Sequence, residues 1–448
     1  MSTISLSTLP LPVIQAIEAI QDLDGSKFVS SFAPDAILID EAKPHTSPAS
    51  IKAWFEKGMI SHKATIKLLD VGSLDCKTWV HIMMDGNYKE DYGITEPFPL
   101  YLHFLLNASN DLIQRLRVNQ IGPNEPTMRA AWAASGNMED PISDLRNDVW
   151  RIPDIPEGWV RVKVAAASLN FHDIFTLRGI GMFPLTFPLI LGNEAAGTLD
   201  DGTEVIVYPV MGNPEFEGDI THDPDRHVLG EKTQGSLADY VIVPMENVVR
   251  KPKNMSFETA SVLGIAWLTA YRMLFVRSGL KKGQKMLVQG STGGVATALM
   301  QLGCAAGMEV WCTGRTEEKR ALAVQLGAHR TFTPGEELPE KVAAVFDMSG
   351  EQTFKHSMES VGTGGTIVSC GLHSGAFAQL DLMKLFTQGI NIHGTYAGNK
   401  DDFEALVKFV SEKGIKPLVQ GVLPLERAEE GLKMILEGSA KGKVIIKM

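Results

Sequence analysis

The residues with the clearest chemistry form a glycine-rich turn, Gly290-Ser291-Thr292-Gly293-Gly294. The turn follows a short apolar run, Met286 to Val288, and precedes a stretch of small residues from Val295 to Ala306. This is the order of a strand, a tight turn and a helix. Glycines let backbone amides approach a pyrophosphate closely, and a helix N-terminus offers unpaired N–H groups and a partial positive charge. The pattern therefore predicts a dinucleotide site at the turn, with Val295 as the first residue of the helix.

The residues after the next strand, Glu309 to Cys312, indicate which nucleotide is accepted. A carboxylate there binds the ribose 2′-hydroxyl of NAD and repels the 2′-phosphate of NADP. The chain instead reads Thr313-Gly314-Arg315-Thr316, with Lys319 and Arg320 one turn further on. The prediction is therefore NADPH, with Thr313, Arg315 and Lys319 among the residues that bind it. The alternative is that Arg315 and Lys319 begin an ordinary solvated helix.

Alternating strands and helices continue beyond this unit and predict an α/β domain with a doubly wound parallel sheet. Apolar runs end at Asp347 and at Cys370. Because ligands bind at the carboxyl ends of parallel strands, the loops that follow add Ser349, Gly371 and Leu372 to the expected cofactor contacts. A last strand, Asn391 to Gly394, is expected at the edge of the sheet.

Composition limits the classes of partner. The 448 residues are 44% hydrophobic and 21% charged, which is typical of a soluble globular protein of two to four domains. The net charge of −11 argues against a nucleic acid or an anionic membrane surface as partner. We also expect no signal peptide and no membrane span, because no apolar stretch approaches about 18 residues. Scattered cysteines, with no C-x-x-C pair, indicate the cytoplasm; they are Cys76, Cys304, Cys312 and Cys370.

The first 125 residues have a different organisation. Helical periodicity is expected over Pro12 to Asp22, Gly25 to Phe32 and Pro48 to Gly58. Alternating runs then predict antiparallel strands over residues 64–71, 77–85, 99–107 and 111–119. Helices followed by an antiparallel sheet make an α+β module.

Within this module the stretch LDGSKFVSSFAPDAILIDEAKPHTSPASIKAWF resembles the SnoaL-like, NTF2-like cone fold. The resemblance implies a pocket enclosed by the sheet, used for isomerase, cyclase or dehydratase chemistry or left vestigial in a dimer-forming module. An aspartate beside a histidine there would make an acid/base pair. The residues expected to reach the pocket are Asp40, His45, Trp54, His81, Asp85, Tyr101 and His103.

A linker punctuated by proline and glycine, Ile121 to Pro126, separates the module from the rest of the chain. Short strands and turns follow and predict a β-rich, barrel-like unit. From Met128 onward, the chain resembles the medium-chain dehydrogenase/reductase superfamily through VKVAAASLNFHDIF, PLILGNEAAG, QGSLADYVIVP, GIAWLTAYRML, QGSTGGVA and GKVIIKM, in that order. The resemblance implies a GroES-like domain joined to a Rossmann domain.

The zinc ligands of that superfamily have no counterparts in this sequence. Zinc-dependent members carry a Cys, a His and a Cys where this chain has Asn170, Asn193 and Ile265. Amides are poor zinc ligands, and isoleucine cannot bind zinc at all. We therefore expect no metal ion at these positions. Reduction of an activated double bond or carbonyl by hydride, as in quinone and enoyl reductases, is the better fit.

Such a reaction needs a donor for the substrate oxygen. Zinc-free reductases often place a tyrosine in the lid after the first loop, but the lid from Leu177 to Pro188 has none. The expected catalytic residues are therefore Asn170, His172 and Asn193, with His172 as donor or proton relay and Tyr208 as a further candidate. Asp173 and Glu194 are expected to orient neighbouring groups.

The sequence thus predicts three domains: residues 1–123, NTF2-like; residues 128–262 with 395–448, GroES-like; and residues 263–394, Rossmann. The predicted activity is an NADPH-dependent, zinc-independent reduction of an enone, enal or quinone-like small molecule by a cytoplasmic homodimer. One alternative is a bifunctional enzyme whose first domain adds isomerase, cyclase or dehydratase chemistry. Another is a nucleotide-binding sensor or assembly protein without catalysis.

Overall fold

The computed structural model describes residues 6–40, 43–74, 77–92 and 94–448. The chain forms two compact units. The first extends to Met128 and includes the later segment Asp148–Ile152; the second contains Arg129–Asn147 and Pro153–Met448. The later segment belongs to the first unit through the ion pair of Asp148 with Arg117 at 2.9 Å.

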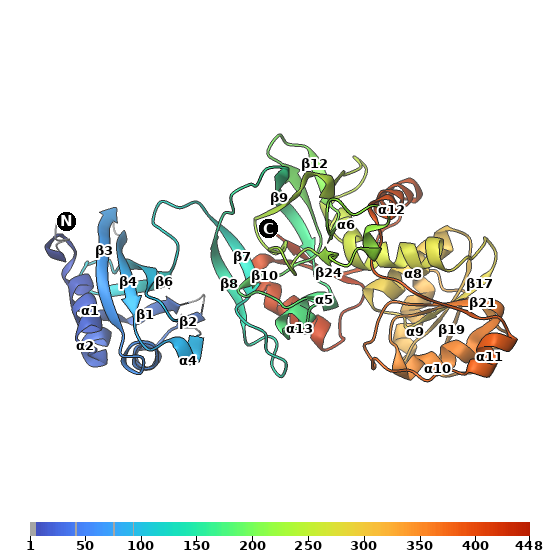
Figure 1. Ribbon diagram of the computed structural model, residues 1–448, viewed down its shortest axis with the longest axis horizontal. Coiled ribbons are helices and arrows are strands. Elements are labelled where there is room, and N and C mark those ends of the chain that lie inside the picture. Colours follow the sequence, from blue (N-terminus) through green and yellow to red (C-terminus); the bar gives the residue numbers. More distant parts are fainter. Residues whose placement is uncertain (1–5, 41–42, 75–76, 93) are drawn as a thin grey trace. The chain divides into compact units, whose positions relative to one another are not determined.

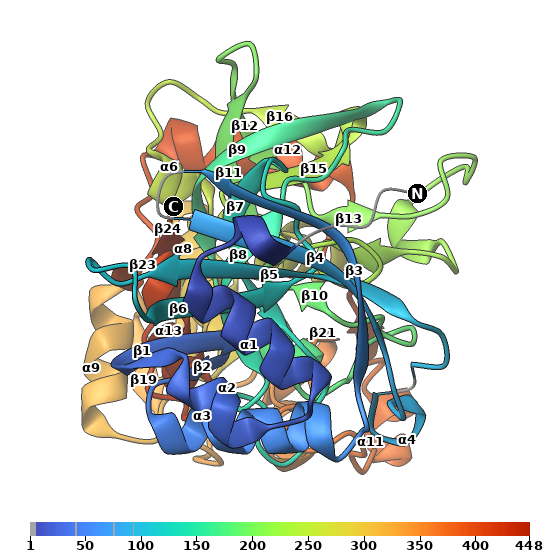
Figure 2. The same cartoon turned by 90° about the vertical axis from the view of Figure 1, so that its left-hand side faces the viewer.

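The first unit is an α+β fold in which helices cover one face of a six-stranded sheet, as Figure 2 shows for α1 and α2. The strand order is β2-β1-β6-β5-β4-β3, and only β1 and β6 run parallel. Its elements are α1 (Leu11–Gln21), α2 (Gly25–Ser30), β1 (Phe32–Asp40), β2 (Lys43–His45), α3 (Pro48–Phe55), β3 (Thr65–Leu74), β4 (Lys77–Asp85), α4 (Lys89–Tyr92), β5 (Phe98–Leu106) and β6 (Ile113–Asn119).

The interior of this unit is apolar. Along β4 the side chains alternate, so that Val80 and Ile82 are fully buried while Trp79 and His81 are only half-buried. The buried set packs against Ile17 and other apolar residues of the helices. The face of the sheet that lies against the helices is therefore filled by aliphatic and aromatic side chains.

The second unit begins with strands that build a mixed sheet of order β16-β12-β11-β9-β24-β23, with β15 also paired to β9. We call this the mixed sheet. The elements of this part of the chain are β7 (Thr127–Ala133), β8 (Leu145–Arg151), β9 (Trp159–Ser168), α5 (Phe171–Leu177), β10 (Leu189–Ile190), β11 (Ala195–Leu199), β12 (Glu204–Val207), β13 (Val210–Met211), β14 (His227–Val228), β15 (Tyr240–Pro244) and β16 (Val248–Arg250). Of these, β10, β7 and β8 form a separate three-stranded sheet, and β13 pairs with β14. The end of the chain returns to this sheet through β23 (Val419–Pro424), α13 (Ala428–Leu436) and β24 (Lys443–Lys447).

Between these parts lies a six-stranded parallel sheet of order β19-β18-β17-β20-β21-β22, which confirms the predicted doubly wound architecture. Figure 1 shows α8 to α11 around its strands. The elements are α6 (Phe257–Ala260), α7 (Leu268–Tyr271), β17 (Lys285–Gln289), α8 (Gly294–Ala305), β18 (Glu309–Thr313), α9 (Glu317–Gln325), β19 (Arg330–Phe332), β20 (Val342–Asp347), α10 (Glu351–Ser360), β21 (Val361–Ser369), α11 (Leu382–Thr387), β22 (Asn391–Gly394) and α12 (Lys400–Lys413). As predicted, β22 is an edge strand.

One apolar core joins the two sheets of the second unit. It contains Ile206 of the mixed sheet, Val288 of the parallel sheet and Phe403 of α12. The two sheets are therefore held as one body, and side chains from both can contribute to a single site. Among the described residues, no helix is both long and apolar enough to cross a membrane.

Candidate active site

The predicted dinucleotide turn follows β17, at the point where the strand order of the parallel sheet reverses. Gly290 has φ of +111°, a conformation that favours glycine. Its N–H donates to Thr313 Oγ1 at 3.0 Å, which joins the ends of β17 and β18. Gly293 caps α8, and a Cβ placed on it would meet no atom within 4 Å. The turn therefore opens onto space that a pyrophosphate can enter beside the first N–H groups of α8.

The side chains proposed for a 2′-phosphate lie at the end of β18. Arg315 is exposed and Lys319 is half-buried, and neither side chain makes an ion pair with another described residue. Glu318 pairs with Lys441 instead. A Cβ on Gly314 would lie 3.0 Å from Ser291 Oγ, so the two loops approach closely. Two cations are therefore available next to the glycine turn.

The loops after β20 and β21 lie on the same edge of the sheet. Asp347 is fully buried and accepts hydrogen bonds from the N–H groups of Ser349 and Gly350, both at 3.0 Å. Gly371 leaves no room for a side chain, because a Cβ would lie 2.2 Å from Met348 O. Leu372, which follows it, is 56% exposed. The structure thus brings all the predicted cofactor residues to one edge, while an open hollow of about 520 Å³ lies at the opposite ends of these strands.

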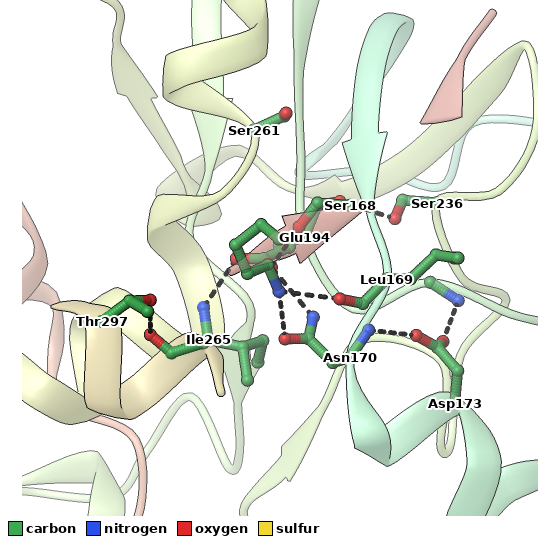
Figure 3. Close-up of polar contacts among 12 residues, drawn as sticks. Ser168, Leu169, Asn170, Asp173, Glu194, Ser236, Ser261, Ile265 and Thr297 are labelled. Atoms are coloured by element: carbon green, nitrogen blue, oxygen red, sulfur yellow. Dashed lines mark hydrogen bonds and ion pairs between the residues drawn. The ribbon is translucent and has the colours of Figure 1, made fainter. Parts of the chain in front are cut away.

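A buried polar cluster lies against the glycine turn. The Glu194 carboxylate accepts hydrogen bonds from Asn170 Nδ2 at 2.9 Å and from Ile265 N at 2.8 Å, and it forms an ion pair with Lys443 Nζ at 2.8 Å (Figure 3). Gly442, just before Lys443, donates its N–H to Thr292 O at 2.8 Å. The start of β24 therefore joins this cluster directly to the dinucleotide turn.

Asn170 is not the free donor that the sequence predicted. Its Nδ2 donates to Glu194, and its Oδ1 accepts from Lys443. Asp173 completes the arrangement by accepting the N–H groups of Asn170 and Gly192, each at 2.8 Å. Burial raises the pKa of Asp173, and these two backbone hydrogen bonds oppose the rise. Asp173 and Glu194 thus orient their neighbours as expected, and Asn170 is part of the support.

Two other predicted donors are also engaged. Asn193 is buried, and its Nδ2 donates to Leu229 O at 2.7 Å. The hydroxyl of Tyr208 donates to Gly398 O at 2.9 Å. Both groups stabilise loops of the second unit, because a buried donor takes whichever carbonyl the fold supplies. The Tyr208 hydroxyl has no second proton for a substrate oxygen, and one of the two N–H groups of Asn193 Nδ2 is used by Leu229 O.

His172 remains available and has a partner that the sequence did not reveal. Its Nε2 lies 3.2 Å from Oε1 of Glu231, a carboxylate that is only 1% exposed. Burial would raise the pKa of Glu231. The contact with His172, the charge of His172 and the backbone N–H groups of Val228 and Met182 together outweigh burial, so this pKa lies below its usual value. The His172 side chain is 24% exposed. His172 is therefore a half-buried histidine within ion-pair distance of a buried carboxylate, without the geometry of a hydrogen bond.

The two halves of the site face each other across the second unit. The ring of His373, in the loop after β21, lies edge-on against Phe171 of α5 with centroids 4.6 Å apart. The cofactor edge of the parallel sheet is thus within contact distance of the helix that carries His172. Sequence reasoning missed Glu231 and Lys443; a lysine within the apolar strand GKVIIKM was the one local signal for the latter.

The pocket predicted in the first unit is not formed by the residues proposed for it. His81 and Tyr101 stack with ring centroids 4.1 Å apart, and His103 lies 5.9 Å from Tyr101, on the face of the sheet away from the helices. Side chains alternate along a strand, so the buried neighbours Val80 and Leu102 take the helix side. These three rings therefore line the outer face of the sheet.

The other candidates lie elsewhere in the first unit. Asp40 accepts a hydrogen bond from Trp54 Nε1 at 2.8 Å, and the ring of His45 lies 6.5 Å from that of Trp54. Asp85 is exposed at the end of β4 and accepts the N–H of Gly86. The predicted set thus divides into separate groups, and among the described residues no ion pair joins a carboxylate to His81 or His103.

Comparison with known proteins gives matches to two family models in the second unit. Residues 156–253 match the alcohol dehydrogenase GroES-like domain, and residues 294–412 match the zinc-binding dehydrogenase domain. A zinc-type alcohol dehydrogenase-like protein of Schizosaccharomyces pombe is 28% identical over 333 residues, which are 68% of this chain and 96% of the relative. An acryloyl-coenzyme A reductase of Sulfurisphaera tokodaii is 29% identical over 318 residues, 66% of this chain and 95% of the relative. The solved structure of an NAD-dependent alcohol dehydrogenase, 29% identical, superposes on 72% of this chain and 100% of its own with a TM-score of 0.66.

Proposed function

Residues 156–253 and 294–412 belong to the medium-chain dehydrogenase/reductase family, and on this premise we propose that the protein is an NADPH-dependent reductase of an activated C=C or C=O bond. The observation that carries the proposal is the open glycine turn after β17, together with a histidine near a buried carboxylate on α5, a helix that contacts the same edge of the parallel sheet. The similarity to an acryloyl-coenzyme A reductase and to an NAD-dependent alcohol dehydrogenase supports hydride transfer involving C=C or C=O. We propose an enone, enal or quinone-like small molecule as substrate.

We propose further that the reaction does not use zinc. The positions that hold zinc in metal-dependent members are Asn170, Asn193 and Ile265 in this chain. Asn170 is hydrogen-bonded through both its amide nitrogen and its amide oxygen. Ile265 contributes only its backbone N–H, which donates to Glu194. The ammonium group of Lys443 is hydrogen-bonded to Asn170 Oδ1 and would repel a divalent cation. These residues do not fit a zinc ion.

In this mechanism the residues of the second unit bind the cofactor, orient the reacting groups and protonate the product. NADPH, when bound, supplies a hydride from C4 of its nicotinamide. The turn at Gly290 and Gly293 holds the pyrophosphate, and Arg315 with Lys319 holds the 2′-phosphate. Glu231 fixes the ring of His172, which delivers the proton that completes the reduced product. Cofactor binding is thus assigned to the parallel sheet, and proton delivery is assigned to α5, the helix that follows β9 of the mixed sheet.

The cofactor assignment is tested by Arg315→Ala. A charge-assisted hydrogen bond contributes about 1.5–3 kcal/mol, so we expect the Kd for NADPH to rise about 10- to 100-fold while the Kd for NADH stays unchanged. Nucleotide binding would be measured by titration calorimetry, and turnover by absorbance at 340 nm with a panel of enones and quinones. Lys408→Ala, which removes an exposed cation from α12, is the matched control.

The outcomes separate the possible functions. Equal affinity of the wild-type protein for both nucleotides would refute the 2′-phosphate site. Tight NADPH binding with no turnover on any acceptor would favour a nucleotide-binding sensor over a reductase.

We also propose that the protein is a homodimer formed through β22 and α11. The strand β22 has an unpaired edge, and the helix beside it exposes Leu382, Met383 and Phe386 to 63%, 71% and 73%. Exposed apolar patches and open strand edges are typical of interfaces. We expect Phe386→Asp to convert a dimer into a monomer in light scattering after size-exclusion chromatography. Val324→Asp, at an exposed apolar residue of α9, should leave the dimer intact; a monomeric wild-type protein would contradict the proposal.

For the first unit we propose an NTF2-like module without an active site of its own. Its apolar interior, and the placement of His81, Tyr101 and His103 on the face of the sheet away from the helices, support this assignment over a bifunctional enzyme. We further propose a cytoplasmic location, for which the free thiols Cys304, Cys312 and Cys370 are the support; Cys76 lies outside the described residues. The small-molecule substrate is proposed to bind the second unit alone.

A further inference from the structure

A reductase of this kind needs a hydrogen-bond donor aimed at the substrate oxygen, where negative charge develops. The candidates from the sequence are used inside the protein, as described above for Asn170, Asn193 and Tyr208. The lid from Leu177 to Pro188 contains no tyrosine. A hydroxyl donor that has no partner among the described residues lies instead in a part of the chain that the sequence motifs did not indicate.

Tyr396 has the required group. It follows β22, and its hydroxyl oxygen is buried without a hydrogen-bond partner among the residues that the structure describes. Burying a hydroxyl without a partner is unfavourable, so buried hydroxyls are nearly always bonded to protein, water or ligand. Tyr208, the other buried tyrosine of this region, follows that rule by donating to Gly398 O. The unpaired hydroxyl of Tyr396 is thus a group that a ligand can satisfy.

The position of Tyr396 joins the two halves of the site. The preceding residue, Thr395, donates its N–H to Ser369 O at 3.0 Å, at the cofactor edge of the parallel sheet. The Tyr396 ring lies under the guanidinium of Arg226, 5.2 Å from the ring centre, in the loop that leads to Glu231. Burial raises the pKa of Tyr396, and the charge of Glu231 adds to the rise while Arg226 opposes it. The Tyr396 ring therefore contacts Arg226 of the loop that leads to Glu231, and the phenol keeps its proton at neutral pH.

We propose that Tyr396 is a catalytic residue that donates a hydrogen bond from its hydroxyl to the carbonyl oxygen of the substrate. The assignment rests on the proposed function. When hydride bonds to the β-carbon of an enone, the C=C electrons shift to form an enolate, and its oxygen accepts the Tyr396 hydrogen bond. A proton from His172 then bonds to the α-carbon, so NADPH is oxidised and the enone is reduced. Because the phenol holds its proton, it stabilises the oxyanion and is not itself the acid.

The experiment compares Tyr396→Phe with Tyr208→Phe. Both changes remove one buried hydroxyl, but only the first removes the proposed donor. Loss of one oxyanion donor lowers kcat by about 10²-fold. We expect this loss for Tyr396→Phe, with the KM for enone and the Kd for NADPH changed by less than about threefold, and a kcat within about twofold of wild type for Tyr208→Phe. Equal kcat values for the two variants, or a weakened Kd for NADPH with unchanged kcat, would overturn the assignment.

A binding measurement separates this assignment from the proposed function. The probe is p-nitrophenolate, a stable oxyanion, titrated by its absorbance into the complex of the protein with NADP⁺. We expect the Kd to rise about tenfold in Tyr396→Phe and to stay unchanged in Tyr208→Phe. This result would support the donor even if no enone or quinone were turned over, in which case only the reductase proposal fails. Equal affinity of wild type and Tyr396→Phe, or no binding to either, would refute Tyr396 as the oxyanion donor.

Discussion

Replacing Lys443 by methionine is expected to lower the free energy of unfolding by about 3–5 kcal/mol, the cost of removing one partner from a buried ion pair. Lys443 is 3% exposed and Glu194 1%. Methionine keeps the length of the side chain but removes the ammonium group that contacts Glu194, Asn170 Oδ1 and Leu169 O. The carboxylate is then left buried with neutral hydrogen-bond donors alone. Urea unfolding followed by tryptophan fluorescence measures the loss.

Two controls make the Lys443 result specific. The double variant Lys443→Met with Glu194→Gln removes both charges and should recover more than half of the loss, because no buried charge is left unpaired. Lys433→Met breaks the exposed pair with Glu429 and should change the free energy of unfolding by less than about 1 kcal/mol. Equal small losses for Lys443→Met and Lys433→Met would show that the buried ammonium does not stabilise the fold.

The second large effect is expected at His172. Glutamine in its place can still donate a side-chain N–H to Glu231 but cannot transfer a proton at neutral pH. Proton transfer by a positioned side chain contributes about 10²- to 10⁴-fold to a rate. We therefore expect His172→Gln to lower kcat by at least about 10²-fold with little change in the Kd for NADPH. Steady-state kinetics at 340 nm and nucleotide titration measure the two quantities.

The matched control for His172→Gln is His329→Gln. His329 is an exposed histidine whose Nδ1 accepts the N–H of Val310 on the outer side of the parallel sheet. This change should leave kcat within about twofold of wild type. If His172→Gln retained full kcat, the proton would have to come from another group or from water, and the pair with Glu231 would be structural.

The sequence alone predicted the parallel sheet and the cofactor edge because both depend on local order. The run from Met286 to Gly294 contains strand, turn and helix start in consecutive residues, so no distant contact is needed to recognise it. The same holds for the C-terminal ends of strands, which placed Ser349, Gly371 and Leu372 on the same edge as the glycine turn. The residue types alone also show that positions Asn170, Asn193 and Ile265 carry no side chain that is a good zinc ligand.

Partners for hydrogen bonds were decided by the tertiary structure. Asn170 and Asn193 have the chemistry of oxyanion donors, but packing supplied Glu194 and Leu229 O as their acceptors. His172 meets Glu231 only after α5 and the loop of residues 228–234 are brought together. In the first unit, too, local sequence was not sufficient. Alternating polar and apolar residues predict the two faces of a strand, but they do not say which face the helices will cover. Local sequence determines which groups a protein offers, whereas long-range packing decides which of them remain unpaired and free for chemistry.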